Sequence, residues 1–406
     1  MTEKKPEKKQ KQHGVAEDMN TPPELSDTKK HTLYKTLEVA REKVTTEIKD
    51  KCEGKKKFVI WIAQIDPDAI GSAMVIRYYL MVCLNIDPSY IQIYYGGAVS
   101  HAQNRCIFNI FELDNLFQRI SCEEVPHKEE EEIWFLVDSN DLNDSRFSGM
   151  DLSDIDIIID HHRISAKQKT EDKIYFIDSI GSASTLTVEL LETECSGLEN
   201  LPSDSDREKV LTLASIGIRN DTNNFTSALT HTRDTEALNK LIPFIDNDLT
   251  IQVENYPLDN NYFSILSNVL ETRKVKGIRA IASAGYIYEE DGDQLAEACN
   301  LLIREARVSI AVVWGIILET GRVRLSIRSK DVSLNLDSKL KEVFEGKGGA
   351  KQTKGVAEGG VHLDMGDFVP SGPLKDDETY KEYWRNIIEA NITGKISLML
   401  KDSGED

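Results

Sequence analysis

The feature of this sequence that most limits its possible folds is an alternation of short apolar runs with amphipathic segments. The apolar runs begin at Phe58, Ile91, Ile133, Ile155 and Ile174. Apolar residues at helical spacing lie between or after them, at about 70–85, 103–112, 182–193 and 206–219. Short apolar strands alternating with amphipathic helices are typical of a mainly parallel sheet covered by helices. We therefore predict an α/β fold for this part of the chain.

The rest of the chain predicts a second, smaller α/β unit. Residues 233–275 are mostly helical in pattern and poor in strand signal. After them we expect strands near 278–288, 308–319 and 323–328, and helices near 292–304, 335–345 and 377–390. The predicted division is a disordered arm at 1–30, a first domain at 31–250, a helical linker at 251–276 and a second domain at 277–400.

Composition narrows the class of partner. The chain has 406 residues and a net charge of −20, which argues against a broad nucleic-acid or anionic-membrane surface. A small anionic substrate stays compatible with this charge if metal ions supply the positive charge. Six cysteines without a C-x-x-C pair indicate reduced thiols in a cytoplasmic protein. The most apolar stretches, such as 74–86, are too short for a membrane span.

Acidic side chains follow the predicted strands at their carboxyl ends, where function collects in open parallel sheets. The positions are Asp66, Asp68, Asp138, the triplet Asp160-His161-His162 and, after an apolar helix, Asp221. One such Asp is most simply a helix cap or a turn residue. Several converging carboxylates would repel one another, and divalent metals relieve that repulsion. A carboxylate and imidazole set without thiolates suits Mn²⁺ or Mg²⁺ better than structural zinc.

These motifs, in this order, resemble the four motifs of the DHH phosphoesterase superfamily. The glycines Gly348 and Gly349, followed by the glycine-rich stretch 355–360, resemble its usual C-terminal partner, the DHHA1 substrate-binding domain. The resemblance covers about residues 58–370 and is strongest to the nanoRNase/pAp-phosphatase (oligoribonuclease) branch.

The resemblance implies two metal sites. Asp66 and Asp138 would hold the first metal. Asp138 would bridge to the second, which Asp68, His161 and Asp221 complete.

The resemblance also implies roles for the remaining polar residues of these motifs. His162 would face the substrate phosphate as a donor or proton shuttle, and Asp160 would orient the histidines. The family usually has a His where this chain has Ile62. A strand period of two places Gln64 on the same face as the carboxylates, so Gln64 is a further possible ligand.

Two glycine-containing stretches predict contacts with the substrate. The glycines at the start of the stretch 96–105 would let the backbone approach a ligand closely, and Arg105 at its end is suited to binding a phosphate. A tight turn that leads into a helix explains this stretch equally well. The stretch 346–351 offers backbone N–H groups to phosphate, with a flexible loop as the alternative. The predicted substrate-binding residues are Asn104, Arg105, Arg328, Gly348, Gly349 and Lys351. The stretch 181–185 predicts either an anion-binding helix N-terminus or a plain Ser cap.

Taken together, these features predict a cytoplasmic metallophosphoesterase, an exonuclease-like hydrolase with two Mn²⁺ ions, or Mg²⁺ in their place. Its substrates would be short RNA or small nucleotides such as nanoRNA, pAp or dinucleotides. We expect no membrane partner and no long duplex nucleic acid, and we leave a homodimer open. The alternative is a catalytically impaired nucleotide-binding sensor or scaffold of the same fold.

Overall fold

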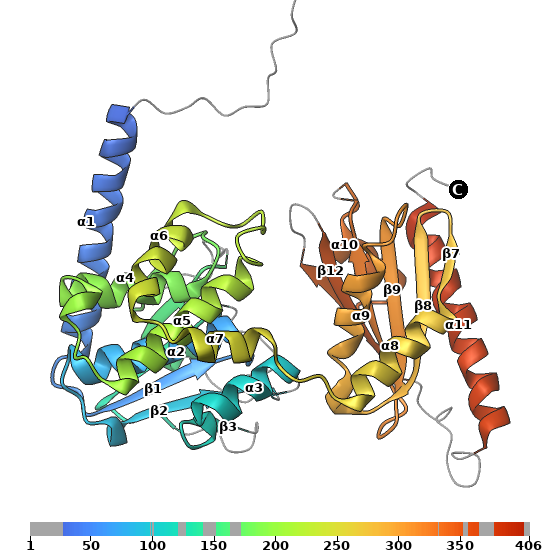
Figure 1. Cartoon of the computed structure of the whole chain (residues 1–406), viewed down its shortest axis with the longest axis horizontal. Helices are drawn as coiled ribbons and strands as arrows, with labels where there is room; N and C mark the ends of the chain where they lie inside the picture. The colour runs from blue at the N-terminus through green and yellow to red at the C-terminus, as the bar shows by residue number, and fades with distance from the viewer. Residues whose placement is uncertain are drawn as a thin grey trace, which may run out of the picture.

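The computed structural model describes residues 27–97, 99, 101–120, 127–140, 152–162, 172–331, 333–351, 356–364 and 377–401. The predicted arm at 1–30 lies outside the described residues as far as residue 26. Helix α1 (Asp27–Cys52) begins the described chain and projects from the rest of the first sheet's helices (Figure 1).

The first sheet has six strands in the order β3-β2-β1-β4-β5-β6, and every pairing in it is parallel. The strands are β1 (Lys57–Ile62), β2 (Ile91–Tyr95), β3 (Phe117–Arg119), β4 (Glu132–Val137), β5 (Ile157–Asp160) and β6 (Ile174–Ile177). The helices that accompany it are α2 (Pro67–Val82), α3 (Ala102–Phe111), α4 (Ala183–Cys195), α5 (Ser205–Asp221) and α6 (Thr232–Leu241). The prediction of an α/β fold with a parallel sheet covered by helices is confirmed.

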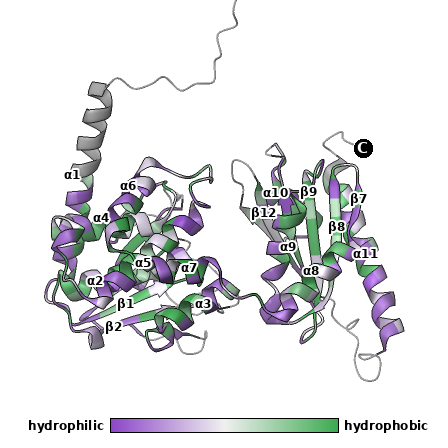
Figure 2. Ribbon diagram, viewed as in Figure 1, coloured by the Kyte–Doolittle hydropathy of each residue, from purple (hydrophilic) through white to green (hydrophobic). Residues whose placement is uncertain are grey.

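Apolar residues on both faces of the strands explain why this sheet is buried. Phe58, Ile60 and Ile62 of β1 belong to a large core that includes residues of α2, α4 and α5. On the opposite face, Trp61 and Trp134 pack with ring centroids 5.2 Å apart. The central strands therefore carry mostly hydrophobic residues, as the green of β1 in Figure 2 shows, whereas the edge strand β3 exposes Gln118 and Arg119.

Two helices, α7 (Asn247–Glu254) and α8 (Asn260–Thr272), lead to a second six-stranded sheet. Its order is β11-β12-β10-β9-β8-β7, antiparallel except between β8 and β9. Its strands are β7 (Lys274–Lys276), β8 (Arg279–Ile287), β9 (Ile310–Ile317), β10 (Val323–Ser329), β11 (Gly348–Lys351) and β12 (Ala357–Leu363). Its helices are α9 (Gln294–Leu302), α10 (Leu336–Val343) and α11 (Glu378–Lys401).

The glycine-rich stretch departs from expectation. Gly348 and Gly349 lie in an edge strand and pair with Val361 and Gly360 of β12. Gly348 and Gly359 also let α10 pack closely, because a Cβ on Gly359 would lie 2.6 Å from Leu340. The expectation of a loop at 346–351 is therefore wrong for residues 348–351, which form β11. Substrate binding by Gly348, Gly349 and Lys351 stays a prediction.

Two further findings concern the described residues as a whole. No helix among them combines the length and apolar character needed to cross a lipid bilayer. The described cysteines, Cys52, Cys83, Cys106, Cys195 and Cys299, are free.

Candidate metal centre

The acidic residues singled out in the sequence meet at the carboxyl edge of the parallel sheet. Asp66 and Asp68 lie where β1 passes into α2, and Asp138 directly follows β4. Asp160 is the last residue of β5, with both histidines after it, and Asp221 is the last residue of α5. The fold thus brings residues from four separate segments into one cluster.

The start of α2 explains the local sequence around Asp66. Its carboxylate caps the helix by accepting the backbone N–H of Ala69 at 3.0 Å, and Pro67 occupies the first helical turn. Asp68 lies within that first turn and is fully buried. The Asp-Pro-Asp segment therefore starts a helix and also turns its second carboxylate toward the cluster.

Asp68 is held by the N-terminus of α4. The Ser182 hydroxyl donates to Asp68 Oδ1 at 2.6 Å. The backbone N–H of Ala183 donates to Oδ2 at 2.7 Å, and that of Ser184 donates to Oδ1 at 2.8 Å. One expectation for residues 181–185 was a helix N-terminus that binds an anion. The anion bound there is the Asp68 carboxylate of the same chain.

Two glycines let α5 approach the start of α2. A Cβ on Gly71 would lie 2.8 Å from the carbonyl oxygen of Leu213. A Cβ on Gly217 would lie 3.0 Å from the carbonyl oxygen of Pro67. Because neither glycine has a side chain, the end of α5 reaches the cluster and presents Asp221 to it.

His161 is the centre of the cluster. Its Nδ1 lies 3.1 Å from the carbonyl oxygen of Ile180, which can only accept, so Nδ1 carries a proton. Its Nε2 lies 3.3 Å from a carboxylate oxygen of Asp221, 3.4 Å from Asp138 Oδ1 and 3.9 Å from Asp68 Oδ2. Both Nε2 and Asp138 Oδ1 are buried without a hydrogen-bond partner among the described residues.

Burial and like charge make this arrangement costly for ionised carboxylates. Burial raises the pKa of Asp138 well above its usual range, and the nearby Asp66 carboxylate adds to the shift. Burial also raises the pKa of Asp68, with Asp221 adding to it. Burial opposes protonation of His161, but the surrounding carboxylates outweigh it and raise the pKa of His161 to about 12. Positive charge is therefore strongly favoured at this point.

A divalent cation fits the donor set. The ligand atoms of Asp68, His161 and Asp221 lie within 4.8 Å of one another, and those of Asp138, Asp160, His161 and His162 form a second such group. Buried polar atoms that face one another without forming a hydrogen bond are expected where a bound ion completes the site. Oxygen-rich ligands with imidazole and without thiolate are suited to Mn²⁺ or Mg²⁺.

His162 differs from His161 in its surroundings. Its Nδ1 lies 2.8 Å from Asp160 Oδ1, and its side chain is 42% exposed. Asp160 is fully buried and also accepts a hydrogen bond from the Asn140 amide, which reaches the carbonyl oxygen of His162 at 3.1 Å as well. Asn140 was not predicted as a site residue. It lies two residues after Asp138, and nothing in its local sequence shows this contact.

Asp138 has an uncommon backbone conformation. Its φ is 55°, in the left-handed region that Asp and Asn tolerate better than other residues with a side chain. Its amide N–H donates to the carbonyl oxygen of Ile159 at 2.9 Å, which anchors the turn to β5. The turn directs the carboxylate toward the two histidines.

The strand period of two, which placed Gln64 on the same face as the carboxylates, does not apply here. Strand β1 ends at Ile62 and α2 begins at Pro67, so a strand period does not extend through Asp66 and Asp68. Ile62 is fully buried in the core, and Gln64 is exposed in the loop between the two elements. The role of Gln64 as a metal ligand stays a prediction.

The predicted substrate-binding residues lie in separate places. The buried Asn104 amide donates to the carbonyl oxygen of Ile65 at 2.6 Å and supports the loop before Asp66. Arg105 lies 3.6 Å from Asp259, which precedes α8. Arg328 is buried in the second sheet, where it donates to Asn300 at 2.6 Å and pairs with Glu358 at 3.6 Å. The structure does not bring Asn104 or Arg328 into the acidic cluster.

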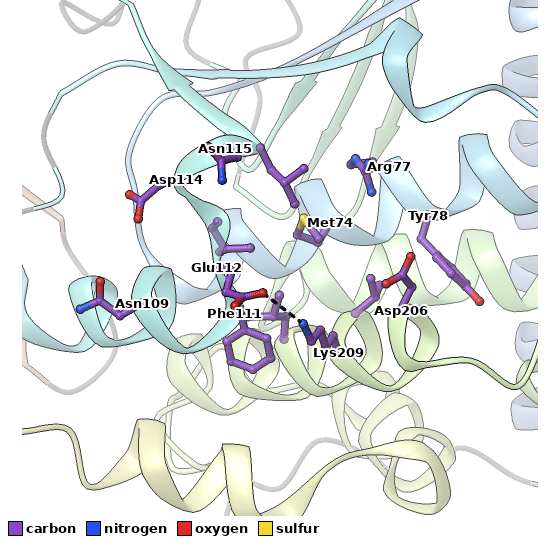
Figure 3. Close-up of a pocket in the computed structure, with 14 residues that line it drawn as sticks. Met74, Arg77, Tyr78, Asn109, Phe111, Glu112, Asp114, Asn115, Asp206 and Lys209 are labelled. Atoms are coloured by element: carbon purple, nitrogen blue, oxygen red, sulfur yellow. Dashed lines mark ion pairs between the residues drawn. The ribbon is translucent and has the colours of Figure 1, made fainter.

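A cavity of about 570 Å³ lies apart from the cluster, between α2, α3 and α5 (Figure 3). Met74 and Arg77 reach it from α2, and Lys209 of α5 pairs there with Glu112 at 3.8 Å. None of the predicted site residues lines this cavity. The acidic cluster at the sheet edge is therefore distinct from this cavity.

Comparisons with known proteins agree with this fold. The chain is 28% identical over 355 residues to an uncharacterised protein of Methanocaldococcus jannaschii, covering 86% of this chain and 65% of that protein. The chain thus spans less than two thirds of that relative's length. The crystal structure of an exopolyphosphatase-related protein from Bacteroides fragilis superposes with a TM-score of 0.60 at 17% identity, covering 85% of this chain and 97% of that one.

A third likeness is to exonuclease RecJ bound to manganese, with a TM-score of 0.44 at 10% identity, covering 86% of this chain and 93% of that one. It is too weak to carry an argument. Residues 57–218 match the model of the DHH family N-terminal domain. This segment contains every predicted metal ligand except Asp221, which follows it on the last turn of α5. This part of the chain is therefore similar to the N-terminal domain of the DHH family.

Proposed function

We propose that this protein is a metal-dependent phosphoesterase of the DHH family that hydrolyses phosphoester bonds in short oligonucleotides or small nucleotides. The observation that carries the proposal is the buried His161 Nε2, which lies 3.4 Å from Asp138 Oδ1 and 3.3 Å from Asp221 without forming a hydrogen bond among the described residues. Such a set is costly without a cation and well suited to one.

The proposed ligands divide between two ions. Asp66 and Asp138 hold the first, while Asp68, Asp138, His161 and Asp221 hold the second. Two bound divalent ions would supply an activated water and neutralise charge that develops on the phosphoryl group.

His162 is suited to proton transfer. Since Asp160 can only accept, the proton of His162 lies on Nδ1 and Nε2 is free to exchange a proton with a bound phosphate ester. The partial exposure of His162 supports this role, because a group that meets substrate has to be accessible.

The second sheet is the proposed substrate-binding unit. Leu325, Ile327 and Val361 pack into the core with α10, so the alternate residues Ser326, Arg328 and Gly360 lie on the opposite face. Gly360 leaves space above its strand, since a Cβ at that position would meet nothing closer than 3.7 Å. The Arg328 guanidinium is buried on this face and held by Asn300 and Glu358, so it would bind a phosphate only in exchange for the pair with Glu358.

The test is hydrolysis of a substrate panel by the full chain in Mn²⁺ or Mg²⁺. The panel contains pAp, pApA, cyclic dinucleotides, inorganic pyrophosphate and bis-p-nitrophenyl phosphate. We expect metal-dependent release of mononucleotide or phosphate from at least one nucleotide substrate, and loss of that activity in Asp138→Asn. Asp246→Asn, which changes a helix cap of α7, is the matched control and should retain activity.

Two outcomes contradict the proposal. Metal-dependent binding of nucleotides without turnover of any member of the panel favours the alternative, a nucleotide-binding sensor, for which Ile62 in the place of the usual His is the supporting observation. Activity that survives in Asp138→Asn excludes the two-ion assignment.

A further inference from the structure

Asp234, a residue of α6 outside the acidic cluster, is connected to the cluster by hydrogen bonds. Its side chain is fully buried. Its Oδ2 accepts the backbone N–H of Gly181 at 2.9 Å and that of His231 at 2.7 Å. Its Oδ1 accepts the hydroxyl of Thr185 at 2.7 Å. The carboxylate therefore joins the segment before α4 to the segment before α6.

The segment before α4 makes hydrogen bonds to two of the proposed metal ligands, Asp68 and His161. Gly181 lies between Ile180, whose carbonyl oxygen meets His161 Nδ1, and Ser182, whose hydroxyl meets Asp68. A displacement of Gly181 would move both neighbours, because they are joined to it by peptide bonds. Asp234 thus fixes the point from which Asp68 and His161 are both oriented.

The segment before α6 follows Asp221, the third of these proposed metal ligands. Asp221 ends α5, and the chain then runs through residues 222–231 to the cap of α6. Asp234 accepts the backbone N–H of His231 in a capping box and so anchors the far end of that segment. Thr222 also packs here, because a Cβ on Gly181 would lie 2.6 Å from its methyl carbon and 2.5 Å from Asp234 Oδ2.

The neighbouring residue reinforces the arrangement. Arg233 is buried and pairs with Asp178 and Glu189, so the segment 178–185 is held at two points from α6. The charge of Arg233 is used in these pairs. Asp234 has three donors and no ion pair among the described residues.

From these contacts we infer that Asp234 is a positioning residue for the metal centre, setting the geometry of Asp68, His161 and Asp221 without touching metal or substrate. The inference rests on the proposed function, because it assumes that these three residues bind a divalent ion. Residues that orient metal ligands through hydrogen bonds typically change metal affinity about 10–100-fold when they are replaced.

The experiment is a calorimetric titration of the full chain with Mn²⁺ alone, without substrate, in four proteins. They are the wild type, Asp234→Ala, Asp234→Asn and the control Asp246→Ala. Asp246 also accepts two backbone N–H groups, at 2.8 and 3.0 Å, but it caps α7 away from the cluster. Circular dichroism establishes that each protein is folded, and its Tm is recorded.

We expect Asp234→Ala to weaken Mn²⁺ binding at least about 10-fold. Asp234→Asn should restore most of the affinity, since its carbonyl oxygen can accept both N–H groups and its amide can donate to Thr185. Asp246→Ala should lower the Tm and leave the affinity for Mn²⁺ unchanged. A merely structural role of Asp234 predicts a lower Tm with unchanged affinity, and that result would overturn the inference.

Gly181→Ala is the second variant, should Asp234→Ala not fold. Its methyl group displaces the carboxylate without removing any charge, and the expected loss of Mn²⁺ affinity is again at least about 10-fold. Unchanged affinity in folded Gly181→Ala overturns the inference. The two proposals fail separately: a wild type that binds Mn²⁺ but hydrolyses nothing contradicts only the proposed function. A wild type that binds no Mn²⁺ contradicts both.

Discussion

Asp160 accepts hydrogen bonds from both the backbone N–H and the ring Nδ1 of His162, at 3.2 and 2.8 Å. This double contact fixes the ring and its tautomer, because a carboxylate accepts but does not donate. It also separates the two histidines in function, since Nδ1 of His161 is held by a backbone carbonyl and its Nε2 faces the carboxylates.

We therefore expect His162→Ala to lower kcat by about 10²–10⁴, the usual range for loss of a general acid or base. Mn²⁺ affinity should change little, since Asp68, Asp138, His161 and Asp221 remain. Asp160→Asn should also lower kcat, because an amide can donate to Nδ1 and favour the wrong tautomer. Steady-state kinetics with bis-p-nitrophenyl phosphate measure both, and a His162→Ala protein with wild-type kcat would exclude the proton-transfer role.

A second prediction concerns the carboxylate of Asp138 and its backbone. Asn tolerates the left-handed conformation at φ 55°, so Asp138→Asn removes the charge with little backbone cost. Hydrolysis should be abolished, a loss of roughly 4 kcal/mol or more in transition-state stabilisation. In chelator the same variant should have a higher Tm than the wild type, since it removes a buried carboxylate whose pKa burial raises.

Comparison with Asp138→Ala tests how much the left-handed backbone conformation at position 138 costs in stability. That variant removes the same charge but prefers other backbone conformations, so it should be less stable than Asp138→Asn by about 1 kcal/mol. Urea denaturation in chelator measures the difference. Equal stability of the two variants would show that the conformation at position 138 carries no cost.

The strand-end acids were predictable because each follows a recognisable apolar run and because parallel strands end at one edge of the sheet. Asp66, Asp138 and Asp160 all lie where this reasoning puts them. The helix start at Ser182 was also predictable, but its partner was not: the anion it binds, Asp68, lies 114 residues earlier in the chain. A sequence pattern can identify a capping residue, but it does not identify a partner so far away in the chain.

Other errors have local causes. Gln64 was placed with the carboxylates by extending a strand two residues beyond Ile62, where the chain turns toward α2. The stretch 346–351 was read as a loop because glycine backbone N–H groups can approach phosphate, yet Gly348 and Gly349 lie in β11 and allow α10 to pack closely. Asp234 carried no signal, because its partner Gly181 lies 53 residues away.

A third prediction concerns Ile62, which stands where the DHH motif that this chain resembles usually has a His. Its side chain is fully buried among apolar residues, so Ile62→His would bury an imidazole without a prepared partner. We expect a loss of about 3 kcal/mol in the free energy of unfolding, measured by urea denaturation. Gln64→His, on the exposed loop, is the control and should lie within about 0.5 kcal/mol of the wild type. Unchanged stability with tighter Mn²⁺ binding in Ile62→His would show that the site accepts the usual ligand after all.

The last prediction uses the thiols as reporters of the fold. Burial raises the pKa of Cys52 to about 12 and that of Cys299 to about 12. The hydrogen bond with Cys83, whose Sγ lies 2.7 Å away, lowers the pKa of Cys195. Since the thiolate is the nucleophile, a raised pKa suppresses alkylation and a lowered one promotes it. At pH 8, iodoacetamide should therefore modify Cys195 well before Cys52 or Cys299.

Peptide mass spectrometry over a time course gives the order of modification in the native protein. Cys195→Ser is the control and should remove the fast label, and unfolding in guanidinium should expose Cys52 and Cys299 to rapid alkylation. Modification of Cys52 or Cys299 at the rate of Cys195 in the native protein would contradict their burial. It would thereby contradict the packing of Cys52 at the end of α1 and of Cys299 between α9 and the second sheet.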